Sequence, residues 1–361
     1  MSSDERLPVA VVGLGTFGRL TVQALASSSI VRLVGLADRD RTLAERTGRE
    51  VGVPAYSDNR HLLAESRPAA VFLSVPPMEA GEILFACAER SIHVWKELPL
   101  GRNLEEAVAL VRRMEKAHLK FAIGTQGRFA PGYRRAWSLR EKLGPVFLGR
   151  AHYLFNWGPD LGWRGDKASC GGGALLELGY HPVDLLVWML GLPEEVYGSS
   201  VGGNRPNGSG SGLGLYDTDD TAAAILRYEG PCMAAIVTTR SSGPVSQELS
   251  LHGRGGSLTA RSESCLLRDP DGNVLDHLSS TLAPVDLFRR QAEAFARAVM
   301  NDERVYECSA RENLLNQAVI EAIYLSDKTS QPESPSRLLK THHLSPEQCL
   351  KYQPKEIVDS E

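Results

Sequence analysis

Short apolar runs alternate with helix-like stretches over the first 124 residues. Residues 9–12 form a continuous apolar run that ends in glycines, as expected for a strand buried on both faces of a parallel sheet. Residues 31–37, 69–75 and 92–95 have the same character, with helical stretches between them. This alternation predicts a doubly wound parallel sheet.

The pattern changes after Arg128. A helix is predicted over 133–143, a strand over 146–157 and an apolar helix over 183–190. Strand-like runs then follow one another without helices between them, over 222–228, 233–239 and 248–252. Runs of strands of this kind indicate an antiparallel or mixed sheet. The predicted fold class is therefore α/β plus α+β, with a Rossmann domain followed by a mixed, mostly antiparallel sheet domain.

A length of 361 residues suggests about two domains. We expect a dinucleotide-binding domain over 1–125, an α/β substrate and oligomerisation domain over 126–330, and a polar tail over 331–361 that wanders on the surface or swaps onto a neighbour. Residues 202–214 are rich in Gly, Ser and Asn, which predicts a loop that is either a lid or disordered. A late helical pair, 288–300 and 312–326, is expected to pack back on the first domain.

Charge and cysteine usage narrow the partners. The net charge of −4 and the isoelectric point near 6.2 disfavour nucleic acid and anionic membranes, which leaves a small molecule as the expected partner. Six scattered cysteines form no CxxC pair and no zinc spacing, so we expect reduced thiols and no metal site. The start of the chain lacks the layout of a secretory signal, and no apolar run approaches the ~20 residues of a membrane helix. We therefore expect a soluble, cytoplasmic protein.

A glycine turn follows the first predicted strand and opens a helix. Gly13, Gly15 and Gly18 form GxGxxG, in which the first glycine permits the tight turn, the second admits a pyrophosphate and the third lets helix and strand pack closely. Asp38 lies at the end of the second strand, where a carboxylate binds a ribose diol. The pattern predicts NAD, while Arg39 could neutralise the 2′-phosphate of NADP. The predicted cofactor-binding residues in this part of the chain are Gly13, Gly15, Thr16, Phe17, Gly18, Asp38, Arg39, Ser74 and Pro76.

Hydride transfer at a carbinol needs a group that accepts or donates the hydroxyl proton. Glu177, His181 and Asp184 lie at spacings of four and three in GALLELGYHPVD, which would bring them near one helical face. We interpret His181 as the acid/base, with Glu177 orienting its imidazole.

The chain resembles the Gfo/Idh/MocA family, named after glucose-fructose oxidoreductase, inositol dehydrogenase and a rhizopine-catabolism protein. The resemblance runs from the GxGxxG through SVPP, HVWKELPL, GWRGDKASCGGGALLELGYHPVD and DDTAAAILRY. It implies a second domain with an open, mostly antiparallel sheet that carries the substrate site and often forms the oligomer interface. It therefore also implies a homo-oligomer, a dimer or a tetramer.

One catalytic position departs from that family. The family uses a lysine from a Glu-Lys-Pro motif, an aspartate, and a histidine four residues later; His181 matches, Glu177 replaces the aspartate, and Leu98 stands where the lysine is expected. Lys96 lies two residues earlier, displaced by roughly 6.5 Å along a strand, and is either a substitute cation or a solvated side chain. The resemblance also places Glu97 and Arg128 at the cofactor, although Arg128 could instead form an interdomain salt bridge.

The loop before the glycine turn at 171–173 supplies the predicted substrate contacts. Trp163, Arg164 and Lys167 lie in this loop, and Arg164 matches a Trp-Arg pair of the family that could bind a substrate hydroxyl or carboxylate. We also predict that Asp184 binds the substrate. Tyr153, Phe155 and Trp157 alternate along a strand and so share one face, which either contacts substrate or packs the sheet.

Three functions remain open from the sequence. The first is an NAD(P)-dependent oxidoreductase that acts on a hydroxyl or keto carbon of a sugar, cyclitol or glycoside-like substrate. The second is a reductase of an imine or conjugated system, because Leu98 can neither donate to a hydroxyl nor lower its pKa. The third is a non-catalytic dinucleotide-binding regulator, against which His181 and its neighbouring carboxylates argue.

Overall fold

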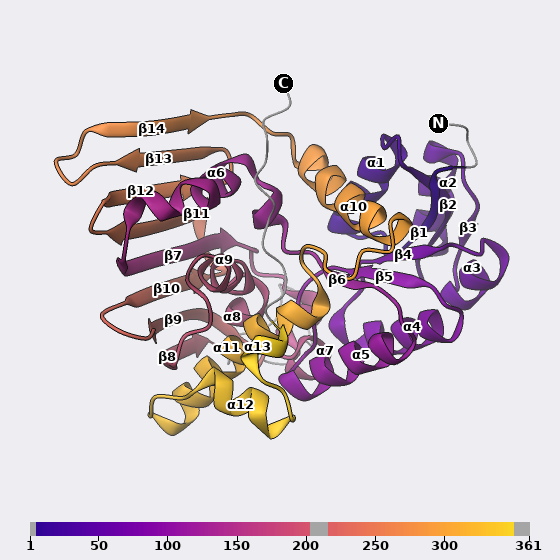
Figure 1. The fold of residues 1–361 in the computed structure, drawn as a ribbon. Coiled ribbons are helices and arrows are strands. Elements are labelled where there is room, and N and C mark those ends of the chain that lie inside the picture. The colour runs from indigo at the N-terminus through magenta and orange to yellow at the C-terminus, as the bar shows by residue number, and fades with distance from the viewer. Residues whose placement is uncertain (1–4, 203–215, 350–361) are drawn as a thin grey trace. The chain divides into compact units, whose positions relative to one another are not determined.

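The computed structural model describes residues 5–202 and 216–349, which divide into two compact units (Figure 1). Of the described residues, the first unit combines 5–100, 106–126 and 283–311. The second combines 101–105, 127–202, 216–282 and 312–349. The domain expected over 126–330 therefore differs from the second unit, because residues 283–311 belong to the first.

The first unit contains a six-stranded parallel sheet in the order β3-β2-β1-β4-β5-β6. This is the strand order of a doubly wound dinucleotide-binding fold, as the sequence predicts. Its strands are β1 (Leu7–Val12), β2 (Val31–Ala37), β3 (Ala55–Tyr56), β4 (Ala70–Leu73), β5 (His93–Lys96) and β6 (Phe121–Ile123).

Helices connect these strands and begin at residues suited to the task. Asp40 accepts a hydrogen bond from the Leu43 amide at the start of α2, and Pro77 occupies the first turn of α4, where its missing N–H costs nothing. The helices of this part of the chain are α1 (Thr16–Ala26), α2 (Arg41–Val51), α3 (Asn59–Glu65), α4 (Pro77–Glu89), α5 (Leu104–Lys116) and α10 (Pro284–Met300). The 3-10 turn η1 (Gln126–Phe129) begins at the last residue before the second unit resumes, and its other residues belong to that unit.

Helix α10 joins the first unit although it follows the second sheet in sequence. Its Phe295 meets Phe72 of β4 edge-on, with ring centroids 6.1 Å apart, and Ala292 and Ala296 lie in the same apolar core. The expectation for this helix is confirmed. The expectation that residues 312–326 also pack on the first domain is wrong. These residues lie in α11 (Ala310–Thr329), which buries Leu314, Val319 and other apolar residues in the second unit.

The second unit contains an eight-stranded sheet in the order β14-β13-β12-β11-β7-β10-β9-β8. Among the described strands of this second sheet, only β7 and β10 pair in parallel, so the sheet is mixed and mostly antiparallel, as predicted. Its strands are β7 (Val146–Asn156), β8 (Glu195–Gly202), β9 (Asp219–Arg227), β10 (Met233–Thr239), β11 (Ser241–Gly253), β12 (Gly256–Arg261), β13 (Ser264–Arg268) and β14 (Val274–Ser279).

Helices cover one face of this sheet. Figure 1 shows α6, α8 and α9 lying over the strands, and α9 contacts β7, β10 and β11. The other face exposes apolar side chains, among them Tyr197, Ile225 and Val237. The helices are α6 (Pro131–Leu139), α7 (Lys167–Cys170), α8 (Ala174–Glu177), α9 (Tyr180–Leu190), α11, α12 (Pro335–Thr341) and α13 (Pro346–Cys349), with 3-10 turns η2 (Arg140–Leu143) and η3 (Gly162–Gly165).

The tail prediction is wrong for the residues that the structure describes. Residues 331–349 contain α12 and α13, and Glu333 pairs through its backbone with Val196 of β8. The tail packs because Leu339 and Cys349 are buried, which the polar composition of the segment conceals. The predicted loop over 202–214 lies outside the described residues after Gly202.

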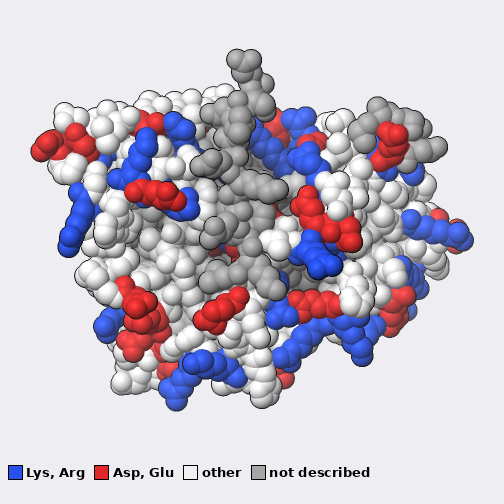
Figure 2. Space-filling model, viewed as in Figure 1, with Lys and Arg blue, Asp and Glu red and all other residues white. Residues whose placement is uncertain are grey.

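Surface and thiol chemistry agree with the composition. Figure 2 shows Lys and Arg interspersed with Asp and Glu on the face in view, without a large area of one charge sign.

All six cysteines are free thiols, as expected. Across the described ranges, every helix is too short or too polar to cross a bilayer.

A buried group of charges ties three helical segments of the second unit together. Arg128 is fully buried, donates through Nε and Nη2 to Asp184 of α9 at 2.6–3.1 Å, and donates through Nη1 to Glu312 of α11 at 2.7 Å. Asn316 donates to the Asp184 carboxylate at 2.8 Å. We call Arg128, Asp184, Glu312 and Asn316 the buried ion cluster. Such a cluster fixes its helices because breaking one contact leaves charge buried without a partner.

We expect Arg128→Met to lower the free energy of unfolding by about 3–5 kcal/mol, since two buried carboxylates lose their cation. Chemical denaturation followed by circular dichroism measures the change. Arg261→Met is the matched control: Arg261 pairs with Glu248 but its side chain is 65% exposed, so its loss should cost less than about 1 kcal/mol. Equal effects of the two substitutions would contradict the role given to the buried ion cluster.

Candidate active site

The glycine turn of the first unit has the geometry that its sequence predicts. Gly13 has φ +87°, and a Cβ there would lie 2.2 Å from the Ser74 carbonyl oxygen. A Cβ at Gly18 would lie 1.9 Å from the Gly13 carbonyl oxygen. By contrast, a Cβ at Gly15 would meet no atom within 4 Å. The first and third glycines are therefore required by packing, while the second faces open space where a ligand can approach the backbone.

That open space adjoins the start of α1. Gly15 is the N-cap residue, and no side chain caps the helix, so its first N–H groups remain available to an anion. Asp38 accepts the Leu14 amide at 2.6 Å and the Asp40 amide at 2.9 Å, which holds its carboxylate beside the turn. These residues fit a dinucleotide: amides for the pyrophosphate and a carboxylate for a ribose diol.

The other predicted cofactor residues of this edge lie around the turn. Thr16 and Phe17 are exposed in the first turn of α1, and Phe17 stacks on Phe288 at 6.4 Å. Ser74 and Pro76 are half-buried where β4 ends and α4 begins. Arg39 is 80% exposed and pairs with Glu79 at 3.1 Å. A surface pair of this kind holds Arg39 only weakly.

The sequence left two interpretations of Lys96, a substitute catalytic cation and a solvated side chain, and the structure supports neither. It is 2% exposed, not solvated, because β5 is an inner strand whose end lies between Leu73 and Ile123. Its ammonium donates to the carbonyl oxygens of Glu97, at 3.0 Å, and Pro99. Burial lowers the pKa of Lys96 to about 8. The ammonium therefore holds the backbone turn after β5, and the role of a substitute catalytic cation loses support.

Glu97 lies in the same turn and is half-buried. Its carboxylate accepts from Gln126 Nε2 at 3.0 and 3.3 Å, within the first unit. Burial raises the pKa of Glu97 to about 8, against the opposing effect of Lys96. Glu97 stays a predicted cofactor residue at the carboxyl end of the parallel sheet, where ligands of such sheets bind.

The predictions that Arg128 binds the cofactor and that Asp184 binds the substrate are both wrong. Both belong to the buried ion cluster, and both are at most 2% exposed, so neither is available to cofactor or substrate as predicted. The salt bridges that Arg128 forms with Asp184 and Glu312 lie within the second unit, so these two are not interdomain salt bridges. His181 and Asp184 both lie in the first turns of α9, but His181 is half-buried whereas Asp184 is buried and bound to Arg128.

A second glycine turn, residues 171–173, positions the helices that carry His181. A Cβ at Gly173 would lie 2.0 Å from the Asp219 carbonyl oxygen. The Asp219 carboxylate accepts from the amides of Gly173, at 2.7 Å, and Leu175, at 2.8 Å, and from the Tyr324 hydroxyl at 2.7 Å. Asp219 and Tyr324 are not among the residues predicted from the sequence. The DDT start of β9 is the signal that could have found Asp219.

The His181 imidazole lies half-buried at the start of α9. Its ring packs edge-on against Tyr153 of β7, with centroids 5.3 Å apart. Among the described residues, neither ring nitrogen has a hydrogen-bond partner. Burial lowers the pKa of His181 to about 4, with Asp184 acting weakly in the opposite direction. The imidazole is therefore neutral near pH 7 and able to accept a proton from a ligand.

Glu177 does not orient this imidazole. Its Oε1 accepts from Arg164 Nε at 2.6 Å, and α8 ends at Glu177 before α9 begins, so the spacing of four does not lie along one helix. Burial raises the pKa of Glu177, opposed by the charge of Arg164. The expectation that Glu177 and His181 share a helical face is wrong because residues 178 and 179 separate the two helices.

Aromatic rings surround Arg164. Its guanidinium carbon lies 4.1 Å from the ring centroid of Trp157 and 4.3 Å from that of Trp163. The ring of Trp157 packs against that of Phe155, with centroids 4.9 Å apart, and the ring of Phe155 packs against that of Tyr153, with centroids 6.5 Å apart. These contacts confirm that the three alternating aromatic residues share a face. Of the predicted substrate residues, Trp163 and Arg164 thus lie together. Lys167 is exposed, with its ammonium 6.0 Å from the Tyr324 ring centroid.

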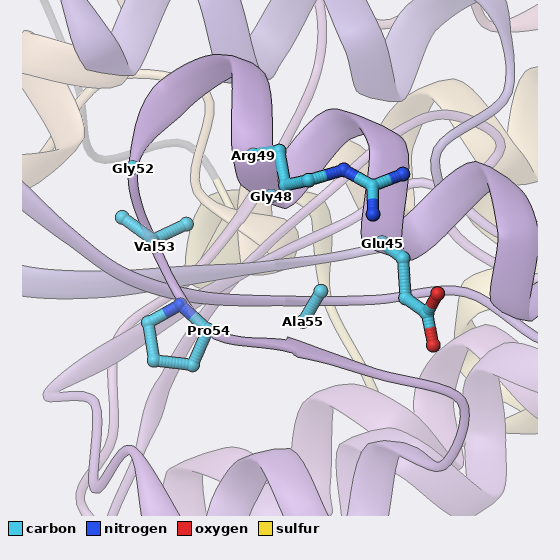
Figure 3. Close-up of a pocket in the computed structure, with 7 residues that line it drawn as sticks. All are labelled: Glu45, Gly48, Arg49, Gly52, Val53, Pro54 and Ala55. Carbon is cyan, nitrogen blue, oxygen red and sulfur yellow. The ribbon is translucent and has the colours of Figure 1, made fainter.

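A separate hollow of about 420 Å³ opens on the first unit (Figure 3). It lies between α2 and the segment that leads into β3, and its walls contain none of the predicted site residues. Its lining is formed by Glu45, Gly48, Arg49, Gly52, Val53, Pro54 and Ala55.

Two family models match the chain. Residues 7–125 match the model described as oxidoreductase family, NAD-binding Rossmann fold, and residues 135–259 match the GFO/IDH/MocA C-terminal domain. The glycine turn and Asp38 lie in the first match, and Arg164, Glu177 and His181 in the second. The first unit thus carries an NAD-binding Rossmann fold.

Named relatives cover most of the chain at modest identity. A D-xylose 1-dehydrogenase (NADP(+)) of Haloferax volcanii is 26% identical, over 88% of this chain and 97% of its own length. A myo-inositol 2-dehydrogenase of Thermotoga maritima is 25% identical, over 73% of this chain and 79% of its own. A levoglucosan dehydrogenase structure, in complex with NADH and L-sorbose, shares the fold with a TM-score of 0.85 at 20% identity, covering 91% of this chain and 99% of that one.

We expect Gly15→Arg to abolish NADH binding, because its side chain would fill the open space in front of α1. Fluorescence titration with NADH measures the affinity, and an unchanged thermal midpoint shows that the variant is folded. Gly15→Ala is the control: its Cβ meets no atom within 4 Å, so it should bind better than the arginine variant. Wild-type affinity in folded Gly15→Arg would refute this site.

Proposed function

This chain belongs to the Gfo/Idh/MocA family of oxidoreductases, and from that premise we propose that it transfers hydride between NAD and a hydroxyl or keto carbon of a sugar, cyclitol or glycoside-like substrate. The names of its relatives, which are xylose and inositol dehydrogenases, support this substrate class. Bound NAD supplies the acceptor or donor of hydride. The chain's own residues bind the dinucleotide, hold the substrate and move the hydroxyl proton.

The neutral imidazole of His181, whose ring nitrogens have no hydrogen-bond partner among the described residues, carries this proposal. In the oxidation direction, its free ring nitrogen accepts the carbinol proton as the hydride leaves, and in the reduction direction the same nitrogen returns the proton. Tyr153 packs against the ring and holds its orientation without taking up either nitrogen. His181 thus acts as the acid/base with no carboxylate partner.

A reductase of an imine or conjugated system is the second candidate. The Lys96 ammonium is held by two backbone carbonyl groups, and Leu98 occupies the position where the family places its lysine. A site that relies on His181 alone has less means of stabilising an alkoxide, which favours substrates without a strongly bound hydroxyl proton. Turnover of cyclic imines in preference to sugars would select this candidate.

We infer a preference for NAD over NADP. Asp38 would repel the 2′-phosphate of NADP, while its two backbone contacts keep the carboxylate beside the glycine turn. Arg39 is the residue that could offset this repulsion, since its pair with Glu79 is exposed and easily broken.

A homo-oligomer formed through the open face of the second sheet is part of the proposal. Tyr197 of β8 lies beside Ile225 of β9, and Ala223 of β9 lies beside Val237 of β10, so exposed apolar residues are neighbours across three strands. Contiguous apolar surface of this kind is typical of protein interfaces. A second copy of this chain is the partner that we propose, as a dimer or tetramer.

A cytoplasmic location completes the proposal. Its support is the set of six free thiols, five of which are buried. Thiols persist in reducing compartments, whereas secreted proteins pair most of their cysteines.

We expect His181→Asn to keep NADH affinity and to lower turnover by about 10²-fold or more, the usual effect of removing an acid/base. The wild-type pH profile is a finer test. Protonation removes the acceptor nitrogen, so kcat/KM for oxidation should fall as the pH drops through the pKa of His181, near 4. An acidic limb near the ordinary histidine value of about 6.5 would contradict the assignment.

We expect Asp38→Ala to narrow the NAD/NADP affinity ratio by about tenfold, because one unfavourable charge contact of roughly 1.4 kcal/mol disappears. Titration with both reduced dinucleotides measures the ratio. Glu79→Ala, which frees Arg39 while leaving Asp38 in place, is the comparison. If only the Glu79 variant changes the ratio, Arg39 and not Asp38 selects the cofactor.

A further inference from the structure

Lys96 carries a buried charge that the proposed proton transfer does not use. It is 2% exposed, and its ammonium donates to the carbonyl oxygens of Glu97, at 3.0 Å, and Pro99. Among the described residues, no carboxylate forms an ion pair with this ammonium. Burying a charge without a partner of opposite sign is costly, and buried groups of this kind gather at functional sites. The place of Lys96 in the parallel sheet indicates the function.

Lys96 lies in the half of the sheet that receives nicotinamide. A doubly wound sheet binds one mononucleotide over each half, on either side of the point where the strand order reverses, and here that point lies between β1 and β4. Asp38, the proposed ribose ligand, follows β2 and so assigns the adenosine half to β1, β2 and β3. The nicotinamide half then falls to β4, β5 and β6. Lys96 is the last residue of β5, at the carboxyl end where ligands of such sheets bind.

The charge at this end of β5 is positive near pH 7. Burial lowers the pKa of Lys96 to about 8, while Glu97 and Glu106 of α5 act in the opposite direction, so the ammonium keeps its proton near pH 7. Burial also raises the pKa of Glu97 to about 8, and its carboxyl group therefore contributes little negative charge at that pH. The ammonium of Lys96 is thus not fully compensated.

The two redox states of the cofactor differ in the charge of one ring. The nicotinamide ring of the oxidised form, NAD, is cationic, whereas that of NADH is neutral, and the rest of the dinucleotide is the same in both. A positive charge beneath the nicotinamide half therefore repels NAD more than NADH. Because the ammonium is buried, water and salt screen this repulsion less than they would at the surface.

We propose that Lys96 is a specificity-determining residue that makes the site bind NADH in preference to NAD. The inference rests on the cofactor of the proposed function and not on its substrate. Tighter binding of NADH than of NAD shifts the equilibrium between the bound species, because a difference in affinity between two states is what moves their balance. The charge of Lys96 thus favours oxidation of the carbinol by the bound cofactor.

The test measures the dissociation constants of NAD and NADH in the absence of substrate. Fluorescence titration gives the value for NADH, and displacement of NADH by NAD gives the other. At pH 7, Lys96→Met should lower the preference for NADH about tenfold, the scale of one partly screened charge contact. Loss of the two hydrogen bonds to the turn disturbs both dinucleotides alike. The ratio of the two constants therefore reports the charge and not the shape of the turn.

Lys120→Met is the matched control. Lys120 is another buried lysine of the first unit, with its side chain 9% exposed, but it precedes β6 at the amino end of the strand and pairs with Asp302 at 2.8 Å. Its loss should keep the wild-type ratio.

The wild-type chain covers the case in which Lys96→Met does not fold. Between pH 7 and about pH 9, Lys96 loses its positive charge and Glu97 gains a negative one, since the pKa of each is about 8. Both changes remove repulsion of NAD. The wild-type preference for NADH should therefore fall over this range.

The outcomes separate this inference from the proposed function. The wild-type ratio in folded Lys96→Met, or an equal change of ratio in Lys120→Met, would overturn the role of Lys96 and leave the oxidoreductase proposal standing. If Lys96→Met does not fold, a wild-type ratio that stays constant from pH 7 to about pH 9 would overturn it in the same way. Failure of the wild-type protein to bind either dinucleotide would overturn the role of Lys96 together with the proposed function.

Discussion

The buried ion cluster is the contact on which the arrangement of the candidate active site depends. Arg128 has no access to solvent, and its guanidinium is shared between Asp184 of α9 and Glu312 of α11. Each charge stays buried only while the others are present, so η1, α9 and α11 cannot shift independently. Because Asp184 lies one helical turn after His181, the same contact fixes the helix that carries the imidazole. The cluster thus positions the helix that carries His181 and takes no part in the proposed proton transfer.

The two glycine turns of the molecule are built in the same way. In each, a carboxylate at the end or start of a neighbouring strand accepts backbone amides of the turn: Asp38 binds the amide of Leu14, and Asp219 binds those of Gly173 and Leu175. Glycines are needed where the backbone of the turn approaches another backbone closely, as at Gly13 and Gly173. The first turn prepares amides for a dinucleotide, and the second sets α8 and α9, which end and begin beside Glu177 and His181.

Much of the fold could be predicted from the sequence because it depends on local patterns. Buried parallel strands read as continuous apolar runs, and the GxGxxG turn reads as three glycines with separate steric reasons. The site was predicted less well, because the sequence pattern does not show which groups satisfy its buried charges. Lys96 is charged yet buried, since two carbonyl oxygens only one and three residues away satisfy it. Asp184 shares a helix with His181 but faces inward to Arg128, 56 residues earlier in the chain. Neither partner follows from spacing.

We propose that His181 works as a neutral proton acceptor, with no carboxylate partner among the described residues. Burial holds its pKa near 4, and Glu177, which spacing assigns to it, is bound to Arg164. NMR titration of the nine histidines, with His181→Asn to assign the signal, measures this property directly. If burial lowers the pKa of His181 to about 4, its imidazole stays neutral from pH 7 down to about pH 5. A midpoint at or above about 6.5, the value of an unperturbed histidine, would contradict it.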